Sequence, residues 1–584
     1  MVAPRPGARL LLLLALLVPA SGCRRGEDSR PNLILILVDT LRSDHLHAYG
    51  YPRETSPSLD ALAGRGVLFE QAISAAPWTL PSAMSLLTGR LPSSHRVEND
   101  GMKLAPEIPI LAEILKGAGY STSAVVSHIY VDSPFGFQRG FDRFDDFGLS
   151  KGYRFEAGLE PRAEQVTDHV LAEVRRMEKG RPFFLLAHYF DPHWNYDPPA
   201  PYDTRFTGAY SGQVTGSYSS FSEYIMPGKI LPPAELQHLR DLYDGEIAYT
   251  DAQIGRLLET LERQGVARRS VVVLVSDHGE EFKEHGSLGH GRDLYDEVTR
   301  VPLMVADLRK PAPARRIKEE VRSIDVFPTL CALAEVLPPR GVQGVSLIPF
   351  LSGEGGEGRS AISETIRFDA YRKSYREPNA KLIVGLESNS RELYDLTSDP
   401  GEQTNLWERR GQEALAMEQA LFEQVDVLDG GWNLRWSSDG SPHHFTGSIE
   451  TDGQITAVVP LFPQAGRHRV ARGKRIDFDL EGVERSGGIS FAVDPAGARV
   501  GFSLFMDGAP ESRRVFIGVR RTVPSASPFS FAGSGPAELF TKPVFSSGRE
   551  LGYFLWKSPG PSREEASELS EAMKERLRSL GYIR

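Results

Sequence analysis

The stretch NLILILVDT (residues 32–40) decides the fold that the sequence predicts. Its uninterrupted apolar run, 33–38, is typical of a parallel β-strand that is covered on both faces. Similar runs occur at 121–127, 182–189 and 270–276. Helical periodicity lies between the runs, at 56–66, 110–119 and 249–265. Repeated strand and helix units predict an α/β domain with a mostly parallel sheet.

Polar residues follow these apolar runs at what we expect to be one edge of the sheet. The first run ends in Asp39, and the fourth ends in Asp277 and His278. Ligands of such sheets bind beyond the carboxyl ends of the strands, so we expect these side chains to lie close together. Two carboxylates and an imidazole are costly to bury together unless a cation lies between them. The sequence therefore predicts a metal site here.

The composition is that of a globular protein with more than one domain. The chain has 584 residues, of which 40% are hydrophobic and 25% are charged. This is ordinary globular usage in a chain too long for a single core. The net charge of -10 is spread along the sequence without a Lys/Arg block, which argues against a nucleic-acid partner.

Residues 1–22 are predicted to be an export signal. Basic residues precede an apolar run over residues 10–20, which is about half the length needed to span a bilayer as a helix. The small residues before Cys23 resemble the lipobox of bacterial lipoproteins. We therefore expect Cys23 to be acylated and residues 23–31 to link a lipid anchor to the body, in the periplasm or at the outer membrane. A plain secretory signal is the alternative.

Longer motifs resemble those of the sulfatase family in the alkaline phosphatase superfamily, and they occur in the same order. They are PNLILILVDTLRSDHLHAYGY (31–51), TLPSAMSLLTGRLPSSH (79–95), FDPHWNYDPP (190–199), VVLVSDHGEEFKEHGSLGHGRDLYDEVTRVPLMV (272–305), SIDVFPTLCALAEV (323–336) and RELYDLTSDPGEQTNL (391–406). The resemblance covers residues 32–425. It implies an α/β sandwich with one large sheet and a small antiparallel subdomain from about residue 360.

Thr79 stands where the resemblance implies a nucleophile. Sulfatases carry C-x-P-S-R at this place and convert the cysteine to formylglycine, whereas this chain has Thr79-Leu80-Pro81-Ser82-Ala83. One interpretation is that Thr79 only caps a helix over residues 81–88 that ends at Gly89. The chain is also similar here to phosphoethanolamine transferases, lipoteichoic-acid synthases and nucleotide pyrophosphatases. Their threonine implies that Thr79 is both nucleophile and metal ligand.

The same resemblance implies one divalent metal. Its implied ligands are Asp39, Thr79, Asp277 and His278. Sulfatases more often offer only oxygen ligands, which suit Ca²⁺, whereas one imidazole favours Mn²⁺ or Zn²⁺. Relatives with two metals carry an Asp followed four residues later by a His. Here the residue four positions after Asp251 is Gly255 instead of a histidine, so we expect a single ion.

The resemblance also implies histidines around a bound ester. The candidates for substrate binding are His193, His285 and His290. His193 matches a histidine that protonates the leaving group, and His290, at the place of a sulfatase lysine, joins it as a catalytic candidate. The K-x-H motif of sulfatases is missing, with Ser127 and Ile129 near its positions.

The expected activity is hydrolysis of an anionic ester, glycan- or lipid-linked, through a covalent Thr79 intermediate. A phosphothreonine can be hydrolysed by a second displacement, whereas a sulfated threonine lacks the aldehyde exit of formylglycine, so phosphoric esters are favoured over sulfuric esters. Two alternatives remain at this stage. One is an envelope phosphotransferase similar to phosphoethanolamine transferases, and the other is a catalytically weak or inactive surface lipoprotein.

The C-terminal part of the chain has a different pattern. Residues 426–558 contain short alternating segments separated by Gly, Asp and Pro, which predict an antiparallel β-rich accessory module. Residues 559–584 predict a helix that begins with a capping box at Ser562 and Glu565 and stops at Gly581.

Overall fold

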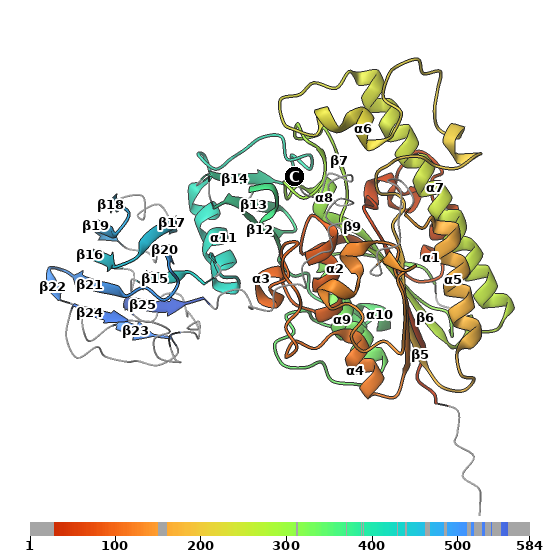
Figure 1. Cartoon of the computed structure of the whole chain (residues 1–584), viewed down its shortest axis with the longest axis horizontal. Helices are drawn as coiled ribbons and strands as arrows, with labels where there is room; N and C mark the ends of the chain where they lie inside the picture. The colour runs from red at the N-terminus through yellow and green to blue at the C-terminus, as the bar shows by residue number, and fades with distance from the viewer. Residues whose placement is uncertain are drawn as a thin grey trace, which may run out of the picture.

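The computed structural model of the chain shows a large α/β domain, a small sheet beside it and a β-rich module at the far end (Figure 1). The described residues are 28–558, apart from 150–159, 311–312, 370, 387, 389, 429, 438–440, 462–467, 484–486, 511–514, 519–527, 532–538 and 540–550. The predicted signal, Cys23 and the C-terminal helix lie outside them. Within the described part, no helix combines the length and apolarity that a membrane span requires.

The large sheet is mostly parallel, as predicted. Its strands are β1 (Asn32–Val38), β2 (Val67–Ile73), β3 (Ser121–Val125), β4 (Arg143–Asp145), β5 (Phe183–Tyr189), β6 (Ser270–Ser276), β9 (Arg300–Asp307) and β10 (Arg315–Arg322). They are ordered β10-β2-β9-β6-β1-β5-β3-β4. Strand β9 runs antiparallel to its neighbours β2 and β6, and the other pairs are parallel.

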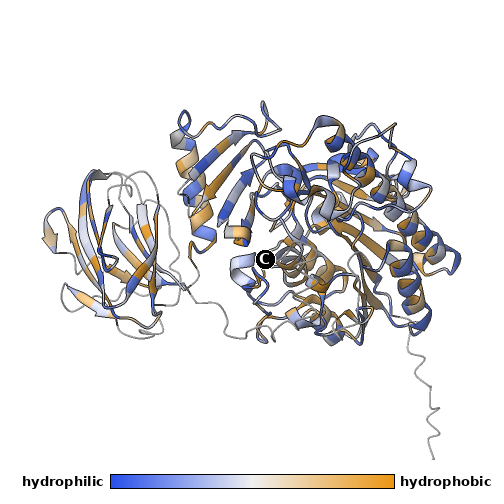
Figure 2. Cartoon of the chain, turned by 45° about the horizontal axis from the view of Figure 1, so that its top comes forward, coloured by the Kyte–Doolittle hydropathy of each residue, from blue (hydrophilic) through white to orange (hydrophobic). Residues whose placement is uncertain are grey.

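The alternation of side chains along β1 builds two separate cores. The side chains of Leu33, Leu35 and Leu37 join one core with α2 (Thr79–Thr88), α4 (Leu111–Gly117) and α9 (Val326–Leu333). Those of Ile34, Ile36 and Val38 join the other with α1 (Pro57–Ala63), α5 (Ala163–Arg176) and α7 (Pro233–Arg263). All six are fully buried. Each contributes about 1.5–3 kcal/mol, which fixes the strand between two helical layers (Figure 2).

A small antiparallel sheet follows the large domain. Its strands are β11 (Ala361–Thr365), β12 (Arg372–Glu377), β13 (Ala380–Gly385) and β14 (Ser390–Asp395). Helix α11 (Gly411–Gln424) packs on it through Ala414, Met417 and Leu421. The remaining short elements of the large domain are α3 (Pro92–His95), α6 (Tyr218–Phe221), β7 (Glu281–Phe282), β8 (Leu288–Gly289), α8 (Asp296–Thr299) and α10 (Ile348–Ser352).

The C-terminal module is a sandwich of two sheets. One contains β17 (Gln454–Leu461), β20 (Gly487–Asp494), β15 (Trp432–Ser437), β25 (Gly552–Lys557) and β23 (Val515–Ile517). The other contains β18 (His468–Ala471), β19 (Arg475–Val483), β16 (His443–Thr451), β21 (Val500–Met506), β22 (Ala509–Pro510) and β24 (Phe529–Phe531). Aromatic side chains from both, such as Trp436 and Phe478, form one core between them.

Helix α2 begins earlier than the sequence predicts. It starts at Thr79 rather than Pro81, and the extended Trp78 is the N-cap, without a side-chain capping bond. The interpretation of Thr79 as a mere cap is therefore wrong, and its hydroxyl group is available for another role. The predicted end is confirmed: Gly89 adopts a left-handed conformation, and its N–H donates to Ser85 O at 2.8 Å.

We predict that Gly89→Ala destabilises the large domain. A methyl group at Gly89 would lie 2.9 Å from Val342 Cγ1 and 3.1 Å from Phe327 Cβ, at a φ of +66°. The conformation alone costs about 1–2 kcal/mol. Calorimetry should show a melting temperature at least about 2 °C lower. As a control, Gly117→Ala at the end of α4 meets no atom within 4 Å and should melt no earlier than wild type.

Candidate active site

Asp39, Asp277 and His278 meet at the carboxyl ends of β1 and β6. One ligand atom from each lies within 4.8 Å of the others, and all three residues are buried. His278 Nε2 is 3.4 Å from Asp39 Oδ1 and 3.4 Å from Asp277 Oδ2. The adjacency of these two strands in the sheet produces the convergence that the sequence pattern predicts.

The Asp277 residue joins three elements at this point. Its Oδ1 accepts hydrogen bonds from the backbone N–H of His278 at 2.8 Å and of Thr40 at 3.2 Å. Thr40 reaches it in a left-handed conformation, with a φ of 53°. The Ser82 hydroxyl group in the first turn of α2 donates to the Asp277 carbonyl at 2.6 Å. This bond ties the start of α2 to the end of β6.

Thr79 faces the cluster from the start of α2. Its Oγ1 lies 3.3 Å from Asp39 Oδ2 and 3.4 Å from His278 Nε2. The side chain is completely buried. At a helix N-terminus, free N–H groups and the helix dipole stabilise negative charge, which suits both an alkoxide and an anionic ester.

The cluster has the chemistry of a cation site. Asp39 Oδ1 and Asp277 Oδ2 are buried without a hydrogen-bond partner among the described residues. His278 Nδ1 donates to the Gly279 carbonyl at 2.9 Å, so once the ring is neutral, as a metal ligand must be, the lone pair of Nε2 is directed at both carboxylates. Two unpaired acceptor oxygens and an imidazole lone pair fit a divalent cation.

The pKa values reflect this crowding of charge. Burial, together with the charge of Asp39, raises the pKa of Asp277 to about 7. Burial alone would lower the pKa of His278, but the Asp277 and Asp39 carboxylates raise it to about 9. The raised pKa values of Asp277 and His278 favour the protonated forms of both side chains in the metal-free protein, and binding of a cation would release these protons.

His188 is a buried neighbour that the sequence analysis missed. It lies in β5, and its Nε2 is 3.5 Å from Asp39 Oδ2. Because the backbone N–H of Ser127 donates to its Nδ1 at 3.4 Å, the ring proton is on Nε2 and faces the carboxylate. This contact orients the carboxylate of Asp39, a candidate metal ligand. The sequence signal that could have identified His188 is a single polar residue within an otherwise apolar strand.

His193 lies close to the cluster in the loop after β5. Its Nδ1 donates to the Trp194 carbonyl at 2.6 Å, and its ring centre is 5.0 Å from that of His290. Burial lowers its pKa to about 4, although Asp39 opposes the shift. The ring of His193 is therefore uncharged at pH 7 in the free protein.

His290 packs directly against the cluster. Its ring centre is 4.4 Å from that of His278, and Glu280 Oε1 lies 2.8 Å from its Nδ1. Burial and the neighbouring histidines hold its pKa well below the ordinary value. The Tyr196 hydroxyl group donates to the other oxygen of Glu280 at 2.9 Å. Glu280 and Tyr196 thus orient His290.

Two other residues considered from the sequence, His285 and Asp251, make their hydrogen bonds to residues outside the cluster. His285 Nδ1 is 2.5 Å from Glu297 Oε1, and its Nε2 is 3.1 Å from the carbonyl of Glu402 near the small sheet. Both ring nitrogens are engaged, so the expected role of His285 in substrate binding is corrected to a structural one. Asp251 accepts the backbone N–H of Leu59 in the first turn of α1 at 2.8 Å.

Arg367 brings a cation to the site from the small sheet. Its Cζ lies 3.8 Å from the ring centre of Trp78, the residue before Thr79, and its Nη2 is 3.3 Å from Tyr130 Oη. The arginine of the sulfatase motif is replaced by Ala83, which is buried in the core. Arg367 could not be predicted as a site residue, because no motif surrounds it and it follows Thr79 by almost 300 residues.

Comparisons with known proteins agree with this architecture. Residues 31–336, more than half of the chain, match the family described as Sulfatase, and residues 283–428 match the C-terminal family of N-sulphoglucosamine sulphohydrolase. An arylsulfatase of Clostridium perfringens is 28% identical over 436 residues, which cover 65% of this chain and 90% of that protein.

Solved structures share the fold at lower identity. A phosphonate monoester hydrolase of Agrobacterium radiobacter is 22% identical, with a TM-score of 0.55, over 67% of this chain and 94% of its own. A protein in complex with its substrate D-glucosamine-2-N,6-O-disulfate is 21% identical, with a TM-score of 0.57, over 68% of this chain and 97% of its own. The chain is thus an ester hydrolase of the sulfatase family in the alkaline phosphatase superfamily.

Proposed function

We propose that the protein is an exported, metal-dependent hydrolase that cleaves the ester of an anionic group through a covalent Thr79 intermediate. The observation that carries the proposal is the position of Thr79 Oγ1, within 3.4 Å of both Asp39 and His278. A lipid on Cys23 would hold the enzyme at the cell envelope. The export signal and the lipobox of the sequence support this location.

Asp39, Thr79, Asp277 and His278 would hold one divalent cation, with Mn²⁺ or Zn²⁺ favoured over Ca²⁺ because of the imidazole. When bound, such an ion lowers the pKa of a coordinated hydroxyl group and neutralises charge on the ester. The chain supplies the orientation of the ligands. Backbone N–H groups hold Asp277, and His188 contacts Asp39.

The reaction proceeds by two displacements. Thr79 Oγ1 gives its proton to Asp39, toward which it donates at 3.3 Å, and forms a bond to phosphorus or sulfur while the bond to the leaving alcohol oxygen breaks. His193 gives that oxygen a proton, because the negative charge of a bound ester favours the protonated ring. Water then attacks the same atom and gives its proton to His193, while Thr79 leaves and takes its own proton back from Asp39. Arg367 and the N-terminus of α2 stabilise the charge on the remaining oxygens.

Phosphoric monoesters of sugars are the favoured substrate class, with sulfuric esters second. A threonine sulfate has no internal route to expel sulfate, whereas a threonine phosphate is hydrolysed by in-line attack. The two structural neighbours act on, or bind, a phosphonate monoester and a sulfated glucosamine. Both substrates carry tetrahedral anionic groups.

We predict that Thr79→Ala lowers kcat at least about 10³-fold, because the covalent route is lost. Turnover of p-nitrophenyl phosphate and p-nitrophenyl sulfate measures this directly. Thr88→Ala is the matched control, since Thr88 lies at the far end of the same helix and its hydroxyl group donates to the Met84 carbonyl. Mass spectrometry of quenched wild-type enzyme should find the transferred group on Thr79. Full activity in Thr79→Ala would overturn the mechanism.

We also predict that Asp277→Asn and His278→Ala each weaken Mn²⁺ and Zn²⁺ binding at least about tenfold. Isothermal titration calorimetry of the metal-stripped protein measures this without reference to turnover. His285→Gln is a control from the same loop and should keep the wild-type affinity, since both nitrogens of His285 face Glu297 and Glu402. Equal affinities in all four proteins would contradict the assigned cation site.

A further inference from the structure

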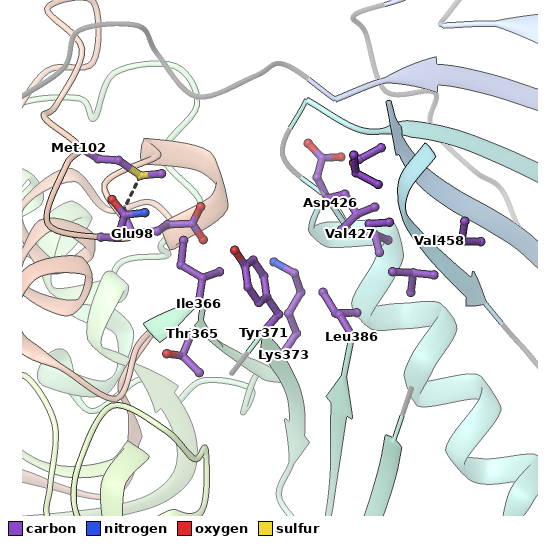
Figure 3. Close-up of a pocket in the computed structure, with 16 residues that line it drawn as sticks. Glu98, Met102, Thr365, Ile366, Tyr371, Lys373, Leu386, Asp426, Val427 and Val458 are labelled. Carbon is purple, nitrogen blue, oxygen red and sulfur yellow. Dashed lines mark hydrogen bonds between the residues drawn. The ribbon is translucent and has the colours of Figure 1, made fainter. Parts of the chain in front are cut away.

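A cavity of about 600 Å³ lies where the large domain, the small sheet and the C-terminal module meet (Figure 3). We call it the junction cavity. Loop residues 98–102 form one wall, the small sheet forms the floor, and β17 and β20 of the module form the opposite wall. Its volume is within the range of about 300–1,000 Å³ that is typical of small-molecule sites.

The lining combines an aromatic ring with apolar and charged groups. Tyr371 and Lys373 project side by side into the cavity from the small sheet (Figure 3). Val427 and Val458 provide apolar walls opposite, and the carboxyl group of Asp426 lies at their edge. Tyr371 is 37% exposed, so part of its side chain is accessible to a ligand.

This chemistry favours a sugar ring over an acyl chain. The C–H face of a sugar packs on an aromatic ring, and its hydroxyl groups donate to carboxylates such as those of Glu98 and Asp426. An acyl chain would instead cover the half-buried carboxylate of Asp426 without offering it a hydrogen bond, whereas Lys373 is already paired with Glu364.

The small sheet connects the junction cavity to the active site. Thr365 lines the cavity, and its hydroxyl group donates at 2.9 Å to the carbonyl of Gly291, the residue after His290. Two residues further along, Arg367 lies over Trp78. Two residues of extended chain span at most about 7 Å. The end of β11 and the residues just after it therefore contribute both to the junction cavity and to the surroundings of Trp78.

The loop of the large domain makes a second connection. Asn99 and Met102 line the cavity, and Asp100 between them lies 3.4 Å from Arg367, through its Oδ1 and Nη1. The Arg367 and Asp100 pair therefore lies between the junction cavity and the start of α2. In a substrate whose ester lies at Thr79, the neighbouring sugar units would extend past this pair into the cavity.

We propose that the junction cavity binds a non-reacting sugar of an oligosaccharide substrate, so that the C-terminal module takes part in substrate recognition. This inference rests on the proposed ester hydrolysis at Thr79. It adds that the enzyme prefers an ester on an oligosaccharide to the same ester on a single sugar, because only the longer substrate fills the cavity.

The test compares substrates of increasing length. Val458→Trp fills the cavity and Tyr371→Ala removes its ring, while Val470→Trp, at a residue 41% exposed in β18, is the control. The substrates are p-nitrophenyl phosphate, glucosamine 6-phosphate and a glucosamine trisaccharide with a terminal 6-phosphate, together with their sulfate counterparts. Both cavity variants should raise KM for the trisaccharide at least tenfold, leave kcat within twofold, and leave the p-nitrophenyl ester unaffected.

Equal KM values of wild-type enzyme for the trisaccharide and the single sugar would overturn the cavity proposal, as would variants that change every substrate alike. Binding of the trisaccharide without its ester, measured by calorimetry, keeps the two proposals distinguishable. If no ester is turned over but this trisaccharide binds wild type and not Val458→Trp, the hydrolysis proposal fails and the sugar site stands. If it binds neither protein, the sugar site fails.

Discussion

The hydrogen bonds of Asp277 are the constraint on which the active site depends. One carboxyl oxygen accepts two backbone N–H groups, those of Thr40 just beyond β1 and of His278 just beyond β6, and the carbonyl group accepts the Ser82 hydroxyl from α2. The second carboxyl oxygen has no hydrogen-bond partner in the described structure and faces His278. A single residue thus aligns two strands and a helix and still presents a free ligand atom.

The rest of the large domain holds this arrangement rigid. Strand β1 lies at the centre of the sheet and is packed by helices on both faces, so its end cannot move relative to β6. Buried leucine and isoleucine side chains supply the rigidity, and close packing leaves little room for alternative positions. The position of Asp39 follows from this packing, because it is the first residue beyond the strand.

Much of the fold was predictable because its signals are local. Apolar runs marked four strands of the large sheet, and the ends of two of them predicted where Asp39, Asp277 and His278 meet. His188 was missed because it lies inside such a run, where burial is the usual explanation for a residue. Arg367 reaches Trp78 only through the docking of the small sheet, which no local pattern shows. His285 was misassigned because a motif fixes neighbours in sequence but not the direction of a side chain.

The origin of Arg367 in the small sheet has a consequence for the order in which the site is completed. The residues that would hold the cation all lie before position 279, within the large domain. The guanidinium group that lies over Trp78, the residue before Thr79, comes from residue 367, which leaves the ribosome later. Because chains fold progressively from the N-terminus during synthesis, a nascent chain can bring the predicted metal ligands together before Arg367 is available to bind an anion.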